Sequence, residues 1–151
     1  SFHCEDCSAH HFAETVYQTH QVIILPPVEF IKEFPDEDVT IHIDRMRLTQ
    51  VITNFLGNAK KFTSQGHIKL GYFCDKEKKE IHFFVEDTGA GIPKEELQMI
   101  FERFYKRNEF VQGVGLGLAI SKVIVEKMNG HIDVQSEVNK GSRFTAVLPY
   151  L

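Results

Sequence analysis

The stretch Gly113-Val114-Gly115-Leu116-Gly117-Leu118 carries a glycine at every second position. A backbone without side chains can approach a charged ligand closely. The apolar residues that follow, from Ala119 to about Met128, predict a helix whose N-terminal amides and positive dipole end would face the same ligand. A glycine-rich helix start alone is also typical of a flexible turn. Two segments further upstream favour the interpretation as a ligand-binding site.

The first of these segments lies in a long predicted helix. Asp44 has the character of an N-cap, the helix is expected to run to about Phe62, and Gly66 is expected to terminate it. Apolar residues fall on one face of this helix at about 100° per residue. They are Leu48, Val51, Ile52, Phe55, Ala59 and Phe62.

A polar stripe borders that apolar face. It consists of Asn54, Asn58 and Lys61. An amide oxygen is a neutral hard ligand for Mg²⁺, and a lysine one turn away can neutralise phosphate. The alternative is an ordinary solvated helix flank, which two asparagines alone do not exclude.

The second upstream segment begins with a carboxylate at a strand end. Asp87 follows the apolar residues of a predicted strand and precedes Thr88-Gly89-Ala90-Gly91. Such a carboxylate can accept a hydrogen bond from the exocyclic amine of adenine, whereas it would repel the carbonyl oxygen of guanine. The alternative is an aspartate that bonds its own backbone in a turn.

Taken together, these segments resemble the catalytic and ATP-binding domain of bacterial sensor histidine kinases. That domain belongs to the GHKL ATPase superfamily, shared with gyrase, a heat-shock chaperone and mismatch-repair proteins. The resemblance covers nearly everything from Asp44 to Pro149. The matching blocks are the N box (Arg47 to Thr63), the first glycine box (Asp87 to Pro93), the F box (Ile100 to Lys106), the second glycine box (Gly113 to Leu118) and the tail from Gly141 to Pro149.

The resemblance implies a role for each matching residue. Asn58 would ligate Mg²⁺, and the catalytic residues would be Asn54, Lys61 and Lys106, with Lys106 reaching the γ-phosphate. Asp87 would hold the adenine amine, and Gly91 and Ser142 would help through ordered water. The full set implied to bind ATP is Asn58, Lys61, Phe62, Asp87, Gly89, Gly91, Ile92, Phe104, Tyr105, Lys106, Gly113, Gly115, Leu116, Gly117, Leu118 and Ser142.

Length and pattern predict one α+β domain. The 151 residues with 42% hydrophobic content can bury one core, and the abrupt start suggests a fragment of a longer protein. Residues 1–20 are expected to form a lead-in, with a helix over Ala9 to Gln18. Five or six strands, mostly in hairpins, and four helices are expected. The resemblance implies a two-layer sandwich, in which about three helices cover one face of a mixed sheet of about five strands (Bergerat fold).

Individual elements follow from apolar spacing and turn residues. A helix should begin at Pro93, with Leu97, Ile100, Phe101 and Phe104 as its buried face. Another helix should end at Asn129-Gly130. The strands are expected around Val39 to Ile43, Ile68 to Tyr72 and Ile81 to Val85, and on both sides of the Asn139-Lys140-Gly141 turn.

The charge and cysteine content of the chain restrict its expected binding partners and compartment. The chain has 17 Lys+Arg against 21 Asp+Glu, a net charge of −4, and no apolar run near the roughly 20 residues that a membrane span needs. We therefore expect no nucleic acid or membrane contact. The 3 cysteines fit a reducing, cytoplasmic compartment. The cluster of His3, Cys4, Cys7, His10 and His11 has no second ligand pair at zinc-finger spacing and is assigned to a first helix, although a metal site there stays open.

The chemistry implied by the resemblance is transfer of the ATP γ-phosphoryl group to a histidine. None of the 8 histidines has the sequence context of an acceptor, so the acceptor should lie in a helical dimerisation and phosphoacceptor domain of the same parent protein. A response-regulator receiver domain should follow downstream. The isolated domain should be monomeric, and the parent is a candidate for an inner-membrane anchor. The alternatives are an ATP-driven clamp of the gyrase or chaperone type and a non-catalytic nucleotide-sensing module.

Overall fold

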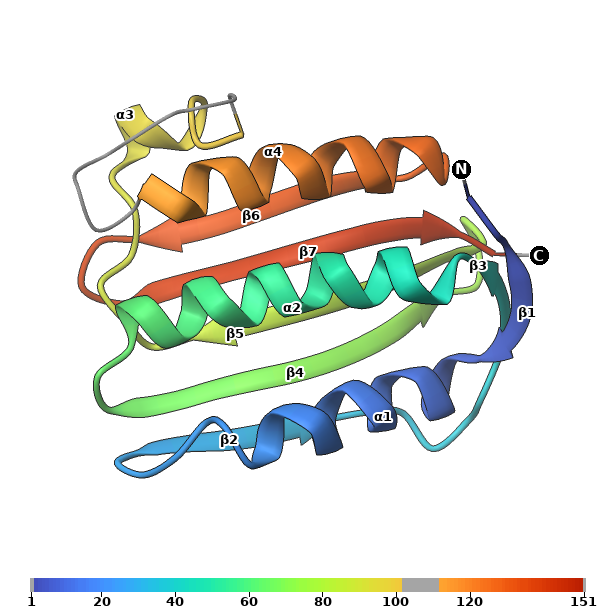
Figure 1. The fold of residues 1–151 in the computed structure, drawn as a ribbon, viewed down its shortest axis with the longest axis horizontal. Coiled ribbons are helices and arrows are strands. Elements are labelled where there is room, and N and C mark those ends of the chain that lie inside the picture. Colours follow the sequence, from blue (N-terminus) through green and yellow to red (C-terminus); the bar gives the residue numbers. More distant parts are fainter. Residues whose placement is uncertain (1, 102–111, 151) are drawn as a thin grey trace.

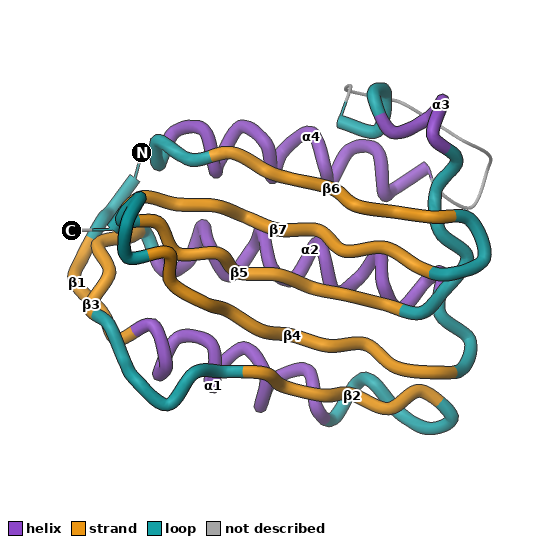
Figure 2. Tube along the Cα trace, turned by 180° about the vertical axis from the view of Figure 1, so that it is seen from behind, coloured by secondary structure: helices purple, strands orange, loops and turns teal. Residues whose placement is uncertain are grey.

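The computed structural model describes residues 2–101 and 112–150, and for residues 112–116 the description is limited to the backbone. Three helices lie on one face of a five-stranded sheet (Figure 1), and the reverse view shows the strands in front of them (Figure 2). These helices are α1 (Ala9–Gln21), α2 (Arg45–Phe62) and α4 (Gln112–Lys127). The predicted two-layer α+β sandwich is therefore confirmed.

The large sheet is mixed, as predicted. Its order is β2-β4-β5-β7-β6, in which β2 runs parallel to β4 and every other neighbouring pair is antiparallel. The strands of this sheet are β2 (Val28–Glu33), β4 (Gly66–Asp75), β5 (Glu80–Asp87), β6 (His131–Glu137) and β7 (Gly141–Pro149). Alternate side chains of β5, such as Ile81 and Phe83, are fully buried beneath the helices.

The boundaries of α2 follow from the residues at its two ends. Asp44 is the N-cap, and its Oδ1 accepts a hydrogen bond of 3.1 Å from the Arg47 N–H. The expected role of Gly66 was wrong. The helix ends at Phe62 because Thr63 already adopts an extended backbone (φ −118°, ψ 107°), and Gly66, with φ 107°, instead begins β4.

The N-terminal segment differs from the predicted lead-in helix. A short strand, β1 (Glu5–Ser8), pairs antiparallel with β3 (Thr40–Ile43) in a separate two-stranded sheet. Ser8 then caps α1, accepting a 3.0 Å hydrogen bond from the His11 N–H, so the helix begins at Ala9, as predicted, and continues to Gln21 rather than Gln18. Cys4 and Cys7 precede the helix rather than belonging to it. The part of the chain that the structure describes contains no group of three His, Cys, Asp or Glu placed to hold a metal ion.

Two predicted helices have other boundaries. The helix after Pro93 is only one turn, α3 (Lys94–Leu97), with Pro93 as its N-cap, and Ile100 is buried from a turn beyond it. Phe104 lies outside the described residues. The last helix, α4, begins at Gln112 rather than Ala119 and ends at Lys127, because the glycine-rich stretch is itself helical. Glycine is a poor helix former, so sequence propensity placed this start too late.

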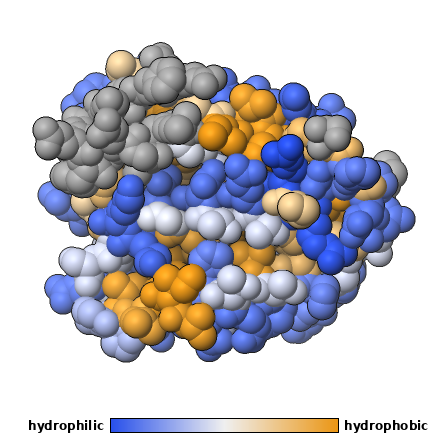
Figure 3. Space-filling model, viewed as in Figure 1, coloured by the Kyte–Doolittle hydropathy of each residue, from blue (hydrophilic) through white to orange (hydrophobic). Residues whose placement is uncertain are grey.

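The helical face of the molecule is mostly hydrophilic but carries apolar areas over α4 and near the end of α1 (Figure 3). Exposed aliphatic residues account for them, among them Val123 of α4 and the segment around Val22 and Leu25 that follows α1. In the described ranges, no helix is long and apolar enough to cross a membrane.

Candidate functional site

Three separate parts of the chain meet at one end of the sheet. These are the C-terminal half of α2, the loop that follows β5, and the turn between β6 and β7 (Figure 1). Strand pairing places Asp87 of β5 opposite Ser142 of β7, and Ser142 opposite Ser136 of β6. The three side chains therefore form a polar row across the sheet, on the side covered by the helices.

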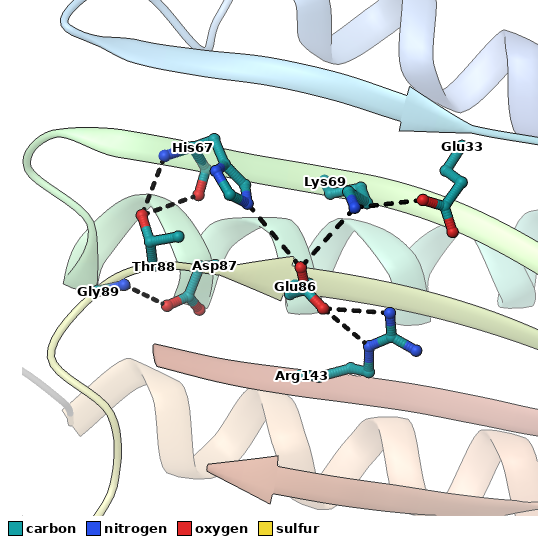
Figure 4. A network of polar contacts seen from close by, with 8 residues as sticks. All are labelled: Glu33, His67, Lys69, Glu86, Asp87, Thr88, Gly89 and Arg143. Atoms are coloured by element: carbon teal, nitrogen blue, oxygen red, sulfur yellow. Dashed lines mark hydrogen bonds and ion pairs between the residues drawn. The ribbon is translucent and has the colours of Figure 1, made fainter. Parts of the chain in front are cut away.

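Asp87 and its neighbour Glu86 point to opposite faces of the sheet and have different surroundings (Figure 4). Glu86 lies on the uncovered face among Arg143 at 3.1 Å, His67 at 3.8 Å and Lys69 at 4.0 Å. Asp87 is 7% exposed, makes no ion pair with a described residue, and accepts a 2.8 Å hydrogen bond from the Gly89 N–H.

The surroundings of Asp87 alter its acidity. Burial raises the pKa of the Asp87 carboxyl above its ordinary value, and hydrogen bonds from the backbone N–H groups of Gly89 and Ser142 and from the Thr63 hydroxyl oppose this rise only in part. A buried carboxylate with no cationic partner has unused acceptor capacity. It is suited to a ligand that supplies a hydrogen-bond donor.

The loop after β5 is held by backbone contacts on both sides. The Ala90 N–H donates to the Phe62 carbonyl at 3.2 Å, and the Asn139 N–H donates to the Ala90 carbonyl at 2.7 Å. A Cβ on Gly89 would stand 2.2 Å from the Phe62 carbonyl oxygen, and one on Gly91 (φ 75°) would stand 2.1 Å from the Glu137 carbonyl oxygen. Both glycines are thus required by the protein's own packing, and their contact with ATP stays a prediction.

The two asparagines of the predicted polar stripe have different surroundings. Asn54 links α2 to α4, because its Nδ2 donates to the Gly117 carbonyl at 3.1 Å and to Ser121 Oγ at 3.0 Å. Asn58 is 8% exposed, and its buried Nδ2, a hydrogen-bond donor, has no partner among the described residues. Lys61, one turn beyond Asn58, is exposed. The catalytic roles of Asn54 and Lys61 remain predictions.

The remaining predicted residues fall into three groups. Ser142 and Ile92 lie beside Asp87, joined through hydrogen bonds to Ser136, while Phe62 ends α2 near the same loop. Gly113, Gly115, Leu116, Gly117 and Leu118 form the early turns of α4, and the Leu118 side chain is 1% exposed in the hydrophobic core. Phe104, Tyr105 and Lys106 lie outside the described residues.

Ser136 is a member of the polar row that the sequence interpretation missed. Its Oγ lies 2.7 Å from Ser142 Oγ and accepts a 2.7 Å hydrogen bond from the Ile92 N–H. The signal was present in the alternation of β6, where Ile132 and Val134 face the core and Ser136 occupies the next inward position. A polar residue at an apolar position of a strand calls for a partner.

The fold and this polar row define an α+β sandwich domain with a candidate ligand site at one end of its sheet. The chain belongs to the family described as histidine kinase-, DNA gyrase B-, and HSP90-like ATPase, whose model matches residues 43–151.

Named relatives agree with this membership. The chain is 38% identical over 128 residues to the sensor histidine kinase WalK of Bacillus subtilis (82% of this chain, 21% of the relative) and 44% identical over 110 residues to the sensor protein SrrB of Staphylococcus aureus (70% and 19%). It thus spans about a fifth of the length of these curated relatives.

Solved structures show the same fold. Full-length ShkA in complex with AMPPNP superimposes with a TM-score of 0.89 at 28% identity, over 99% of this chain and 32% of ShkA. A nucleotide-free catalytic domain of the histidine kinase ThkA gives a TM-score of 0.86 at 28% identity, over 99% of this chain and 97% of that domain.

Proposed function

We propose that this domain binds ATP together with Mg²⁺ and transfers the γ-phosphoryl group to a histidine on a separate helical domain. The observation that carries the proposal is Asp87, a buried carboxylate without a cationic partner, which faces the same side of the sheet as Asn58. The amine of adenine would supply a further hydrogen-bond donor to Asp87. Membership in the ATPase family and the AMPPNP complex of ShkA support this choice of ligand.

The residues present fit a nucleotide with its metal. The buried Nδ2 of Asn58 is a hydrogen-bond donor without a protein partner, and such an atom is costly unless a ligand or water satisfies it. Asn58 would hold Mg²⁺ through its amide oxygen, and the exposed Lys61 ammonium would contact phosphate. A bound Mg²⁺ would offset negative charge on the phosphates during transfer.

The glycines of the two boxes support the same proposal, because protein packing requires glycine in the first box but not at Gly117 in the second. Gly89 and Gly91 are required by protein packing, but a Cβ on Gly117 would only make ordinary contact, 3.5 Å from Asn54 Cγ. Glycine weakens a helix relative to alanine by about 1 kcal/mol. A helical glycine that protein packing does not require is explained by the close approach of a ligand, here the phosphates.

The acceptor histidine is assigned to another domain because the histidines of this chain lie away from the site. His67 is at the same end of the sheet as Asp87, but it lies on the uncovered face beside Glu86. His20 is buried in α1, and His42 and His131 belong to strands β3 and β6. Phosphoryl transfer needs the acceptor in line with the γ-phosphate, and the positions of these histidines favour an acceptor supplied by another domain.

The domain is therefore proposed as one part of a longer two-component sensor kinase. The acceptor hairpin would belong to the same parent protein, and a receiver domain of a response regulator would take the phosphoryl group from it. We place the domain in the cytoplasm.

The proposal is tested by labelling with γ-labelled ATP. The chain alone should gain no stable phosphohistidine, whereas adding a helical acceptor hairpin, fused or in trans, should give an acid-labile, base-stable label on the hairpin. Lys61→Ala should slow this labelling more than it weakens ATP binding, because the lysine charge matters most where negative charge is redistributed. Robust labelling of the isolated chain would refute the split arrangement. An unlabelled hairpin with ATP bound would favour a clamp ATPase or a nucleotide sensor.

A further inference from the structure

Ser121 is a fully buried polar residue in the middle of α4. Its side chain is 0% exposed, and the buried residues about one turn to either side of it, Leu118 and Val125, are apolar. A hydroxyl in such a position is unfavourable unless it takes part in a hydrogen bond. Its partner is Asn54 of α2, whose Nδ2 donates to Ser121 Oγ at 3.0 Å. This bond joins the buried face of α4 to the polar stripe of α2.

The same amide nitrogen has a second acceptor on α4. Asn54 Nδ2 also donates to the Gly117 carbonyl at 3.1 Å, and Gly117 lies one turn before Ser121. An asparagine side chain donates only through its nitrogen and accepts only through its oxygen. Because the nitrogen faces these two acceptors, the planar amide turns Asn54 Oδ1 away from them. In the described part of the chain, no donor reaches that oxygen.

The Asn54 oxygen lies beside the second glycine box. A Cβ on Gly117 would stand 3.7 Å from Asn54 Oδ1, and Asn58, the proposed Mg²⁺ ligand, is one helical turn further along α2. Phosphate oxygens are themselves acceptors, so an amide oxygen in this place is unsuited to bind them directly. It is suited to a hydrogen-bond donor, such as a water held by Mg²⁺.

We propose that Ser121 is a positioning residue for phosphoryl transfer: it holds the Asn54 amide nitrogen against α4 and so keeps the amide oxygen directed at the bound nucleotide and its metal. With the Gly117 carbonyl alone, the amide could rotate about that single hydrogen bond, whereas two acceptors hold it in one orientation. The inference rests on the proposed function, because it assumes that the phosphates lie beside Asn54 and the second glycine box.

The test measures labelling of the acceptor hairpin at saturating ATP, together with ATP affinity by calorimetry. Ser121→Ala removes one acceptor of the Asn54 amide, so the labelling rate should fall by about tenfold, the scale of one hydrogen bond. ATP affinity should change by no more than about twofold, because the contacts of the base and the phosphates are retained. Ser121→Cys creates no cavity but offers only a weak acceptor, so its labelling rate should fall as well.

A double-mutant cycle separates a role through Asn54 from general support of the fold. Asn54→Ala removes the amide itself and should slow labelling more than Ser121→Ala does. If Ser121 acts through Asn54, adding Ser121→Ala to Asn54→Ala should cause no further loss. Val125→Ala is the matched control, since Val125 is 0% exposed one turn later on α4. It should lower the free energy of unfolding but leave the labelling rate within about twofold of wild type.

The orientation of the amide can also be measured without phosphoryl transfer. In the nucleotide-free protein, NMR should show slow exchange with water for the side-chain amide protons of Asn54. Ser121→Ala should accelerate this exchange, and Val125→Ala should not. Unchanged exchange in Ser121→Ala would overturn the proposed positioning.

A wild-type labelling rate in Ser121→Ala, in a system where wild-type protein labels the hairpin, would overturn the role of Ser121 alone. Additive losses in the double mutant would show that Ser121 acts independently of Asn54, which also overturns it. Equal losses of rate and ATP affinity in Ser121→Ala would reduce the role to support of the binding site and would overturn it as well. Failure of the wild-type protein to label the hairpin would refute the proposed function and this inference together.

Discussion

A buried aspartate lies near each end of α2, and the two carboxylates are used differently: Asp44 caps the start of the helix, and Asp87 of β5 begins the loop that contacts its last residue, Phe62. Asp44 is 6% exposed and Asp87 is 7% exposed. Asp44 accepts hydrogen bonds from two backbone groups, the His3 N–H at 2.8 Å and the Arg47 N–H at 3.1 Å. Burial alone would raise the pKa of Asp44, but these two hydrogen bonds, together with the charge of Arg47, lower the pKa below its ordinary value. For Asp87, burial dominates and the pKa is raised.

The contrast separates a side chain that stabilises the fold from one that is available to a ligand. At the Asp44 end, the carboxylate satisfies N–H groups that a helix start leaves unpaired. At the other end, the buried Nδ2 of Asn58 has no protein partner, and the Thr63 hydroxyl contacts Asp87. Equal burial therefore does not imply an equal role, and mutations at the two ends should act on different measured quantities.

The largest expected difference is in nucleotide affinity after loss of the carboxylate. Asp87→Asn should weaken ATP binding by about 2–4 kcal/mol, because an amide nitrogen would face the adenine amine. Calorimetry with ATP, ADP and GTP measures this loss, and the preference for adenine should fall with it. Asp44→Asn is the matched control and should bind ATP as the wild type does. Equal ATP affinities of wild type and Asp87→Asn would contradict the assignment of Asp87.

Metal-dependent binding gives the next largest effect. Asn58→Ala should remove the part of ATP affinity that depends on Mg²⁺, a loss of about tenfold, on the scale of one hydrogen bond to a charged group. Titrations with and without Mg²⁺ would measure it, and affinity without the metal should change little. An unchanged Mg²⁺ dependence would show that Asn58 is not a metal ligand.

The comparison also shows what a sequence can reveal. The bounds of α2 could be predicted because Asp44 is a local cap and the apolar stripe repeats at the helical period. Asp87 could be assigned because its glycine-flanked strand end is local too. The prediction of the α2 bounds and the assignment of Asp87 both depend on residues that lie within a few positions of one another in the sequence.

Non-local features were missed for the opposite reason. The pairing of β1 with β3 joins residues 32 to 38 positions apart, and nothing in the short Glu5–Ser8 segment indicates its partner. Ser136 acquires its role only because β6 and β7 align it with Ser142. The early start of α4 was missed because helix propensity counts glycine against a helix, and the tertiary contact of Asn54 with Gly117 is not local.

A smaller effect, on stability alone, is expected at the capped end. Asp44→Ala should lower the free energy of unfolding by about 1–2 kcal/mol, since both N–H groups lose their acceptor. Urea denaturation measures this change. Asp44→Asn retains an acceptor oxygen and should lose less. Unchanged stability in Asp44→Ala would show that the cap is not needed, and the contrast between the two ends would then disappear.

The smallest expected effect is on how the free energy of unfolding depends on pH, and its sign should be opposite for Asp44 and Asp87. Asp44 has a lowered pKa in the folded state, so its contribution is present above the ordinary aspartate pKa and is lost as pH falls through the lowered value. Asp87 has a raised pKa, so the folded state is favoured while this carboxyl is protonated, and that advantage is lost as pH rises through the raised value.

Urea denaturation of wild type, Asp44→Asn and Asp87→Asn over a range from about pH 3 to pH 8 should resolve these signs. Relative to wild type, Asp87→Asn should gain stability as pH rises above the ordinary aspartate value, because the variant never ionises a buried carboxyl. The free energy of unfolding of Asp44→Asn should be lower than that of wild type at neutral pH, and this difference should disappear as pH falls below the ordinary aspartate pKa. ATP affinity of the wild type should weaken in acid as Asp87 becomes protonated, since a protonated carboxyl is a poorer acceptor for the adenine amine. Parallel pH profiles for the two variants would mean that the two ends of α2 use their carboxylates alike.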